Sequence, residues 1–359
     1  MSNIFCYDIQ DDNDSCYLWD EILNRLLFQF YKKIAFKVDP EKAHDISLSF
    51  LEFIYKSFLG KIFHKRFVKN GIKQFDVLFD NPVGLAAGFD KNADYLNFIT
   101  NIGFGFVEVG TLTPKAQAGN PKPRVFRLAK DEAIINHLGF NNKRIDYGIS
   151  RIKEFNRNIP IGVNIGKNAS TDVKDAFRDY EYCLRKAYSV ADYITLNISS
   201  PNTENLRDLQ KGEKISSFLH SIKTLHDNLK KVYKKHTPLV IKIAPDVTDE
   251  IIFDLSNLVN EYDIDGVICT NTTIDKSYLS DQFKALQGGL SGKPLFQKSN
   301  DVLTKISDVL GRERTIIGVG GIDSYESASE KFRLGANLLQ LYTGLVYKGP
   351  KVIEDILRY

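Results

Sequence analysis

Eight short apolar runs follow one another from Asn81 to the end of the chain. They are PVGLAAG, FVEVGT, IGVNIGK, YITLNISS, LVIKIAP, GVICTNT, IIGVGGI and LLQLYTG. Short β-type runs bounded by turn residues predict buried strands. Helical patterns lie between several of them, at residues 172–189, 214–235, 249–262 and 324–334. Strands alternating with helices are typical of an α/β fold with a parallel sheet, and eight such units predict a closed (β/α)8 TIM barrel.

The competing architecture is an open, doubly wound sheet. Such sheets usually have fewer strands, and their first strand normally leads into a GxGxxG phosphate loop. No loop of that kind follows the first apolar run. The closed barrel is therefore the preferred architecture.

Two amphipathic helices are expected to form a helical hairpin before the barrel. In residues 17–37 the apolar positions recur every three or four residues, which marks one apolar helix face. Asp39 and Pro40 then resemble an N-cap and a first helical position, beginning a second helix that runs to about Phe58. The apolar faces have two interpretations: packing against the barrel, or an entrance for an apolar ligand at a membrane surface. The pattern alone favours packing.

Three parts of the chain follow from this organisation. Residues 1–17 are polar and acidic and are expected to be a mobile tail without chemistry. Residues 18–72 form the helical segment, and residues 73–359 form the barrel domain. At 359 residues, the chain has room for a barrel of about 250 residues with such an appendage.

Charge and cysteine usage exclude several functions. The 48 basic and 45 acidic residues are interspersed, without the basic stripe that nucleic-acid binding needs. Four distant cysteines and six scattered histidines offer no CxxC or HExxH spacing, so neither a disulfide framework nor a metal site is expected. No apolar run reaches the 18 or so residues of a spanning helix, and the N-terminus lacks an export or import signal. We therefore expect any membrane contact to be peripheral.

The predicted strands end in unusually polar residues. Functional groups of a TIM barrel gather at the carboxyl ends of the strands. The polar or glycine residues there are Asp90, Lys91, Thr111, Asn164, Lys167, Asn197, Ser199, Ser200, Asn202, Lys242, Thr270, Asn271, Thr272, Gly320, Gly321, Thr343 and Gly344. Several convergent amides suit a ring edged with C=O and N–H groups, such as a pyrimidine or a flavin. Strand-end caps and turns would explain any one asparagine, but hardly five.

Glycines and lysines add further candidates. The glycines that end the seventh and eighth runs, helped by Gly292, match the phosphate site of such barrels, although GVGG by itself is a weak signal. Lys242 would supply a fixed cation beside a flavin, and Lys91 would hold a substrate carboxylate. The alternative is that either lysine snorkels from a strand end or pairs with an acid such as Asp90. His137 lies near these residues, but a lone loop histidine is more often structural.

Ten motifs resemble the dihydroorotate dehydrogenases in order and spacing. They are NPVGLAAGFDKN, GFGFVEVGTLTP, INHLGFNN, NIGKN, NISSPNT, KIAPD, TNTT, GGLSGKPL, IIGVGGI and LYTGLVYKGP, spread over about residues 40–359. The resemblance implies an FMN-containing oxidoreductase that converts (S)-dihydroorotate to orotate in de novo pyrimidine biosynthesis. The family's membrane-bound, quinone-using class (class 2) has a serine as catalytic base, and NISSPNT carries Ser200 there. The resemblance also implies that the helical hairpin docks on a membrane and admits the quinone, which reverses the packing interpretation.

The resemblance also implies residue roles. Ser200 removes the C5 proton. No His or Asp in NISSPNT can activate its hydroxyl directly, so the proton must leave through a relay or water. Thr203 and Phe140 lie beside that path. The substrate is held by Lys91, Asn136, His137, Leu138, Gly139, Phe140, Asn197, Asn202, Asn271 and Thr272. FMN is contacted by Ala87, Gly88, Lys91, Thr111, Asn164, Asn197, Lys242, Thr270, Gly292, Gly321, Tyr342 and Thr343.

The chain departs from the family pattern in three places. These are the acidic tail, Glu204-Asn205 where the family usually turns with Pro-Gly, and Thr343 where serine is common. The second lies in the loop expected to close over the substrate, so it affects lid motion rather than the reaction. A monomer at the cytoplasmic side of a bacterial inner membrane is expected, with the mitochondrial inner membrane as the alternative.

Overall fold

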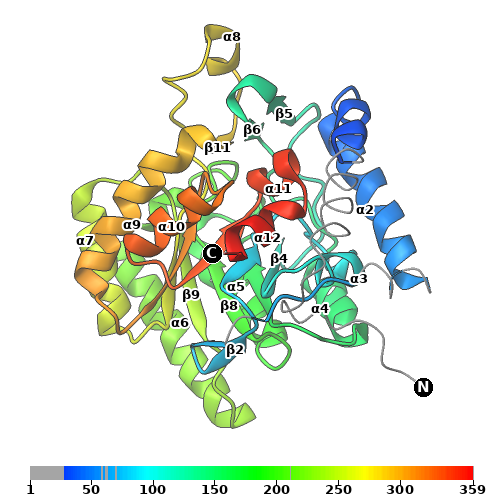
Figure 1. The fold of residues 1–359 in the computed structure, drawn as a ribbon. Coiled ribbons are helices and arrows are strands. Elements are labelled where there is room, and N and C mark those ends of the chain that lie inside the picture. The colour runs from blue at the N-terminus through cyan, green and yellow to red at the C-terminus, as the bar shows by residue number, and fades with distance from the viewer. Residues whose placement is uncertain (1–27, 58–59, 61–63, 69–70, 211, 359) are drawn as a thin grey trace, which may run out of the picture.

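The computed structural model describes residues 28–57, 60, 64–68, 71–210 and 212–358. Its centre is a closed barrel of eight parallel strands, which confirms the predicted (β/α)8 fold (Figure 1). The strands are β3 (Val83–Leu85), β4 (Phe106–Leu112), β7 (Ile161–Ile165), β8 (Tyr193–Asn197), β9 (Leu239–Ile243), β10 (Gly266–Cys269), β12 (Thr315–Val319) and β13 (Leu338–Leu341). Each pairs with the next along the chain, and β13 pairs with β3 to close the ring.

The helices surround the barrel. They are α3 (Leu96–Ile99), α4 (Ile145–Glu154), α5 (Ala176–Ala187), α6 (Gly212–Tyr233), α7 (Asp249–Glu261), α8 (Asp281–Lys284), α9 (Phe296–Leu310), α10 (Tyr325–Arg333), α11 (Thr343–Lys348) and α12 (Lys351–Leu357). Short 3-10 segments lie at Ala129–Asp131, Val173–Asp175, Leu206–Gln210 and Lys293–Leu295. The four helical patterns found in the sequence coincide with α5, α6, α7 and α10 to within a few residues.

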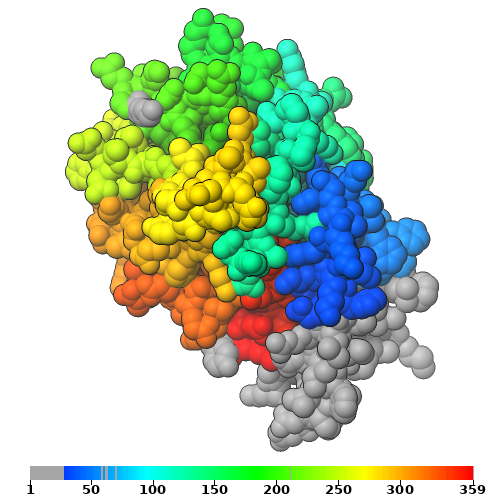
Figure 2. All heavy atoms as spheres, turned by 90° about the horizontal axis from the view of Figure 1, so that it is seen from above, coloured from blue at the N-terminus to red at the C-terminus, as the bar shows by residue number. Residues whose placement is uncertain are grey.

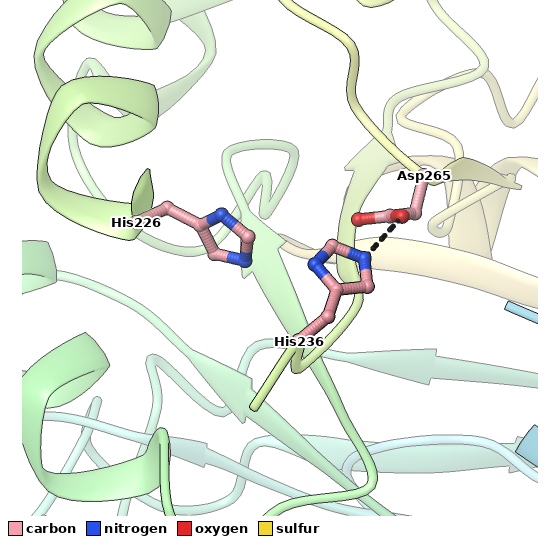
Figure 3. A group of neighbouring side chains, drawn as sticks. All are labelled: His226, His236 and Asp265. Atoms are coloured by element: carbon pink, nitrogen blue, oxygen red, sulfur yellow. Dashed lines mark hydrogen bonds and ion pairs between the residues drawn. The ribbon is translucent and has the colours of Figure 1, made fainter. Parts of the chain in front are cut away.

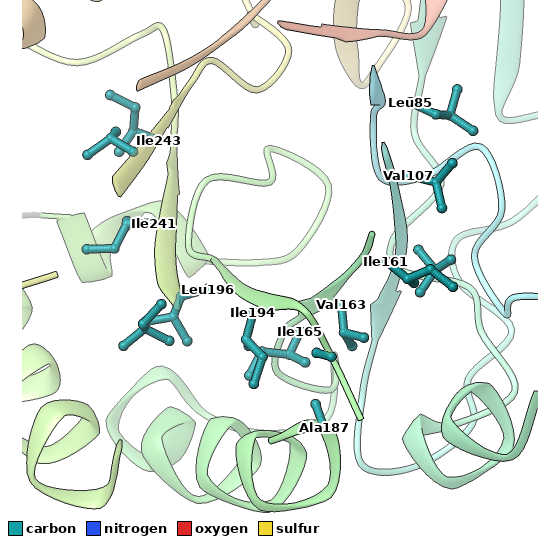
Figure 4. Close-up of a cluster of buried hydrophobic side chains, with 14 of the residues drawn as sticks. Leu85, Val107, Ile161, Val163, Ile165, Ala187, Ile194, Leu196, Ile241 and Ile243 are labelled. Atoms are coloured by element: carbon teal, nitrogen blue, oxygen red, sulfur yellow. The ribbon is translucent and has the colours of Figure 1, made fainter. Parts of the chain in front are cut away.

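Side chains alternate along each barrel strand between two environments. Ile161, Val163 and Ile165 of β7 point outward into the layer between strands and helices, which Figure 4 shows for several strands. The residue between the last two, Asn164, faces the barrel interior and bonds to Glu108 of β4. Because side chains of a strand alternate between faces, the apolar run supplies the outer core while its inner face is free to carry polar groups.

Two antiparallel sheets, absent from the sequence prediction, close the two ends of the barrel. The hairpin of β1 (Ile72–Gln74) and β2 (Val77–Phe79) packs Phe79 against Phe106 with ring centroids 5.1 Å apart at the amino end. At the other end lie β5 (Val125–Leu128), β6 (Ala133–Asn136) and β11 (Gly289–Gly292). Their strands have three or four residues and, unlike the equally short barrel strands, do not lie in the apolar runs from which strands were predicted.

The N-terminal segment lies along one side of the barrel. Residues 28–35 are helical, and α2 runs over Pro40–Lys56 with Asp39 as N-cap and proline in its first turn, as predicted. Seen from above, this segment lies beside the edge of the carboxyl face (Figure 2), where Arg127 of β5 donates to Ala35 O at 3.0 Å. Residues 1–27, including the predicted tail and the start of the first helix, lie outside the described residues. The part boundary at 72/73 remains a prediction.

α2 has two apolar faces, which reconciles the two interpretations of its pattern. Ala43 and Leu48 are buried on the side that faces the barrel. Ile46, Phe50 and Phe53 form a second stripe, with 66%, 62% and 72% of their surface exposed. Packing therefore accounts for only one face of the helix. Within the described residues, no helix is long and apolar enough to cross a membrane.

Candidate active site at the carboxyl end of the barrel

A fully buried carboxylate, Glu108, anchors the polar interior of the barrel. Its Oε1 accepts from Asn164 Nδ2 at 2.8 Å, and its Oε2 accepts from Tyr193 at 2.9 Å, Thr195 at 3.1 Å and Gln340 at 2.8 Å. Sequence reasoning missed this residue, although a charge inside the apolar run FVEVGT was a visible signal. A buried charge requires such a set of donors to offset its desolvation.

From Glu108 a chain of amides and hydroxyls leads toward the top of the barrel. Asn164 Oδ1 accepts from Thr111 at 2.6 Å and from Asn197 at 3.2 Å. Asn197 Oδ1 in turn accepts from Asn271 Nδ2 at 3.3 Å, and that amide also donates to Ser199 at 3.0 Å. Four strands therefore contribute to one network, so the predicted residues Thr111, Asn164, Asn197 and Asn271 do meet.

Ser200 lies just past β8, with 5% of its surface exposed. Its Oγ accepts from the Asn202 backbone N–H at 3.2 Å, and among the described residues no carboxylate or imidazole is bonded to it. Thr203 follows Ser200 closely in sequence, and its Oγ1 is buried and has no hydrogen-bond partner. At the following turn, Asn205 has φ of 56°. Asparagine tolerates this left-handed conformation, so the departure from the family's Pro-Gly still permits a tight turn.

A second group of amides stands opposite, on the antiparallel sheet. Asn202 Nδ2 donates to Asn136 Oδ1 at 3.0 Å, and Asn202 Oδ1 lies 3.2 Å from His137 Nδ1. Gly139 follows with φ of 72°, where a Cβ would lie 2.9 Å from Asn120 Cγ. The loop after β8 and the end of β6 are thereby joined, and Asn136, His137 and Asn202 meet as predicted.

Lys91 does not pair with its neighbour Asp90. Asp90 accepts from the backbone N–H groups of Asp94 and Tyr95 at 2.9 and 2.8 Å, and burial raises its pKa to about 6. Lys91 Nζ donates to Gly88 O at 2.9 Å, and burial lowers its pKa. No hydrogen bond between described residues joins Lys91 to the amides around Asn202. Its ammonium group is thus fixed by a backbone carbonyl at the end of β3.

Lys242 of β9 is buried inside the barrel rather than snorkelling from it. Only 5% of its surface is exposed, and within the described part of the chain its Nζ makes no hydrogen bond. Desolvation lowers its pKa, and the charge of Glu108 opposes that effect. A buried ammonium without a hydrogen-bond acceptor is costly, so this cation suits a ligand that supplies the acceptor.

A small pocket lies where the predicted phosphate glycines meet. Gly292, Gly321, Thr343 and Gly344 line it, together with Glu132, Lys293, Ile322, Asp323 and Tyr347. A Cβ on Gly321 would lie 2.5 Å from Phe296 Cβ, and one on Gly292 would lie 2.3 Å from Glu132 O. These two positions therefore accept only glycine, whose backbone N–H groups can approach an anion closely. Thr343 lies 2.8 Å from Ser291 Oγ, so threonine keeps a bonded hydroxyl at this position.

The remaining predicted residues lie at the same end of the barrel. Gly88 N donates to Gly110 O at 2.7 Å, Thr270 Oγ1 donates to Asn271 O at 2.8 Å, and Thr272 O accepts from Arg207 at 2.9 Å. Ala87 precedes Gly88 after β3, Leu138 O accepts from Asn120 N at 3.1 Å, and Tyr342 follows β13. The roles of all these residues remain predictions.

An aromatic contact series leads from this site toward α2. Tyr342 and Phe89 pack edge to face with ring centroids 5.5 Å apart, and Phe89 and His44 do so at 4.9 Å. His44 Nε2 is 2.9 Å from Phe89 O. Glu41, at the start of α2, accepts from Arg124 Nη2 at 2.6 Å. Sequence reasoning found neither His44 nor this ion pair, because both depend on how α2 docks.

Two of the six histidines, thought to be scattered, come together at the opposite end of the barrel (Figure 3). His236 Nε2 lies 2.7 Å from Asp265 Oδ1, and His226 Nε2 lies 2.8 Å from Thr237 O. Asp265 also accepts from Leu239 N at 2.8 Å. One donor atom from each of the three side chains lies within 4.8 Å of the others.

Comparisons with known proteins agree with this geometry. A family model described as "Dihydroorotate dehydrogenase" matches residues 71–359. A protein of Buchnera aphidicola named "Dihydroorotate dehydrogenase (quinone)" is 47% identical over 334 residues, covering 93% of this chain and 99% of its own length. A protein of the same name from Neisseria meningitidis is 46% identical over 333 residues, covering 92% and 99%.

Solved structures resemble the whole fold. The crystal structure of DHODH from Eimeria tenella in complex with ferulenol has a TM-score of 0.80 and 37% identity, covering 89% of each chain. A ligand-free structure of DHODH from the same organism has a TM-score of 0.79 and 38% identity, covering 89% of this chain and 93% of that one.

Proposed function

This chain belongs to the dihydroorotate dehydrogenase family, and from that premise we propose that it oxidises (S)-dihydroorotate to orotate with FMN as hydride acceptor and a quinone as final electron acceptor. The family consists of oxidoreductases that are generally flavin-dependent, and the relatives compared above are named as quinone enzymes. The observation that carries the proposal is the position of Ser200, buried beside an amide-lined strand end. Such an enzyme serves de novo pyrimidine biosynthesis.

The substrate would bind between the two amide groups. Asn197 and Asn271 belong to the barrel network, whereas Asn136 and Asn202 meet across its top. Amides offer a donor and an acceptor in one plane, which matches the alternating C=O and N–H groups of a pyrimidine ring. Lys91 would hold the carboxylate, with Thr272 and the segment from His137 to Phe140 completing the pocket.

Ser200 would act as the base that removes the C5 proton. A serine hydroxyl is a weak base at neutral pH, and no described imidazole or carboxylate is bonded to its Oγ. The Asn202 N–H already donates to that oxygen, which orients one lone pair. Thr203 Oγ1, buried and without a partner, is a suitable next acceptor for the proton, directly or through water.

The residues present fit FMN. Lys242 is a buried cation without an acceptor, and the pocket beside Gly292 and Gly321 contains Lys293, which is paired with Glu132 and Asp323, as a cation for a phosphate. Thr111, Asn164, Asn197 and Thr270 would add polar contacts, while Ala87, Gly88, Tyr342 and Thr343 border the space. Lys242 would supply the fixed positive charge that favours electron-rich flavin.

The quinone would enter from the side of α2. The exposed stripe of Ile46, Phe50 and Phe53 is suited to a membrane surface. His44 and Phe89 connect that helix to Tyr342 through ring contacts, so a continuous aromatic route would join the flavin pocket to the docking helix. We propose a monomer bound peripherally at the inner membrane of a bacterium, with the mitochondrial inner membrane as the alternative.

Anaerobic mixing of the flavin-loaded protein with dihydroorotate tests the proposal. Flavin absorbance should bleach and recover on addition of a short-chain ubiquinone analogue, but not of fumarate or NAD. Recovery with fumarate or NAD would assign the chain to a soluble class instead. Absence of bleaching despite bound flavin would favour a catalytically silent scaffold. Ser200→Ala should bleach at least about a hundredfold more slowly, whereas Ser221→Ala, a change on α6 far from the strand ends, should match the parent.

A further inference from the structure

Lys331 is fully buried beneath the glycine-rich end of β12. It belongs to α10, none of its surface is exposed, and its Nζ donates to Ser299 Oγ at 2.5 Å. Among the residues that the structure describes, Nζ makes no other hydrogen bond. The Phe296 ring lies 5.5 Å away. A lysine is rarely buried without an acidic partner, so the presence of one here requires a reason.

Ser299 connects this lysine to the backbone of the pocket. Its Oγ lies 3.2 Å from Gly320 O and 2.9 Å from Phe296 O, and both carbonyls are acceptors for the one hydroxyl proton. Gly320 and Gly321 have φ of 120° and 72°. A Cβ on Gly320 would lie 2.7 Å from Ser299 Oγ. The Ser299 hydroxyl therefore packs directly against Gly320, and the next residue of this turn, Gly321, lines the pocket.

The positive charge of Lys331 is not needed for packing, but it would stabilise a bound anion. An apolar side chain of similar length would fill the same space without losing hydration, and such replacements of buried charges are often neutral or stabilising. Burial lowers the pKa of Lys331 to about 7, although the charges of Cys269 and Asp301 oppose that effect. The ammonium form therefore gains from a further negative charge near neutral pH. The pocket beside Gly321 is where the proposed function puts a phosphate.

We propose that Lys331 is a positioning residue for the phosphate group of the flavin nucleotide. Through Ser299 it holds the Gly320–Gly321 turn, and its charge stands behind the pocket that receives the anion. The inference rests on the proposed function, because it takes FMN as the ligand. Riboflavin has the same ring system as FMN but no phosphate, so comparing the two flavins separates a failure of this inference from a failure of the proposed function.

The test compares FMN and riboflavin binding to flavin-free protein by fluorescence quenching. In Lys331→Met, the dissociation constant for FMN should rise about tenfold while that for riboflavin stays within twofold of the parent. Ser299→Ala should move FMN affinity in the same direction, and Lys305→Met, an exposed change on α9, should move neither. An equal loss for both flavins, or no loss for FMN, overturns the inference. A parent that binds neither flavin overturns the proposed function as well.

The pH dependence gives a second readout. The parent's preference for FMN over riboflavin should weaken as pH rises from 7 to 9.5, because Lys331 loses its proton. Lys331→Met should show a smaller change over that interval, since only the phosphate and other groups titrate. Identical profiles in the two proteins would contradict a role for the charge.

A different observation concerns the cluster at the amino end of the barrel. His226 is fully buried, and the Nδ1 atoms of both His226 and His236 are buried without hydrogen-bond partners. The unpartnered nitrogen of fully buried His226 is unusual, because buried polar atoms are nearly always paired, and Asp227 Oδ1 lies 3.7 Å from it. In Figure 3 the two rings lie next to each other beside Asp265, nearly perpendicular at 86° and with centroids 5.4 Å apart.

We infer that this cluster binds a first-row divalent metal ion such as Zn²⁺. The ion would replace the proton between His236 Nε2 and Asp265, and a His226 nitrogen would be the third ligand of an N,N,O set with water as the fourth. Ligands of such an ion stand about 3.3 Å apart, so the present spread of up to 4.8 Å must contract. His236 lies in a loop and is partly exposed, which allows that movement.

Metal titration of chelator-treated protein tests this inference. Co²⁺ should give the visible absorption of a tetrahedral site, and Zn²⁺ should displace it and raise the unfolding temperature. His236→Ala should weaken Co²⁺ binding at least tenfold and His226→Gln should do the same, whereas His220→Ala, elsewhere on α6, should not. Binding unchanged in His236→Ala, or no binding by the parent, would overturn the inference.

Discussion

Replacing Glu108 by glutamine tests the role given to the buried carboxylate. The substitution keeps the shape of the side chain but turns one acceptor oxygen into an NH₂ donor. At the Oε1 position the new NH₂ meets Asn164 Nδ2. Asn164 cannot exchange its own amide ends without cost, because its Oδ1 already accepts from Thr111 and Asn197. At the Oε2 position the NH₂ meets Gln340 Nε2 instead.

The magnitude follows from these contacts. Tyr193 and Thr195 can rotate their hydroxyls to accept. Gln340 can turn its unpartnered Oε1 toward the new NH₂, but its own NH₂ then loses its acceptor, so either placement leaves at least one buried amide donor unpaired. An orphaned buried donor costs about 1–3 kcal/mol, and loss of the charge that offsets the desolvation of Lys242 adds to it. We expect the free energy of unfolding to fall by about 3 kcal/mol. With an unfolding entropy of about 2.1 cal/mol/K for each of 359 residues, that lowers the unfolding temperature by about 4 °C.

Calorimetry of the flavin-free protein at neutral pH measures this shift. Glu261→Gln, an exposed change at the end of α7, is the matched control and should shift the unfolding temperature by less than about 1 °C. Tyr193→Phe removes one of the four donors and should fall between the two. If Glu108→Gln unfolded within 1 °C of the parent, Glu108 would not be the anchor of the network, and the argument from buried hydrogen bonds would fail.

Three further outcomes are expected. Burial lowers the pKa of His44 from 6.5 to about 4. As pH drops from about 6.5 to 4, the unfolded chain therefore binds a proton at His44 before the folded protein does, and stability falls. In urea unfolding, His44→Gln should remove on the order of 2 kcal/mol of that fall. Replacing exposed Phe50 and Phe53 by serine should reduce sedimentation with anionic vesicles at least fivefold, with turnover of a short-chain quinone unchanged; undiminished binding would exclude this face. Gly321→Ala should place its Cβ 2.5 Å from Phe296 Cβ and release flavin on gel filtration, whereas full retention would contradict the role given to this glycine.

The sequence by itself determined the barrel and the identity of most strand-end polar residues. Eight apolar runs with helical patterns between them are local signals, and each strand ends within a few residues of its run. Asn164, Asn197 and Asn271 followed from the rule that strand ends of a barrel converge. The motif order then indicated the family, because side chains that contact a ligand are fixed in chain order by the fold.

Only the tertiary structure decided which of these residues touch and what supports them. Glu108 at the centre of the network, the Lys331–Ser299 contact below the glycine turn and the meeting of His226 with Asp265 each join residues far apart in the chain. The strands β5, β6 and β11 were missed because they lie outside the eight apolar runs from which the barrel was predicted, and the pairing of β11 with β6 is long-range. The two faces of α2 likewise became distinct only when one was buried. Local sequence patterns report the alternation of environments along one element, whereas these contacts depend on closure of the barrel, which brings distant elements together.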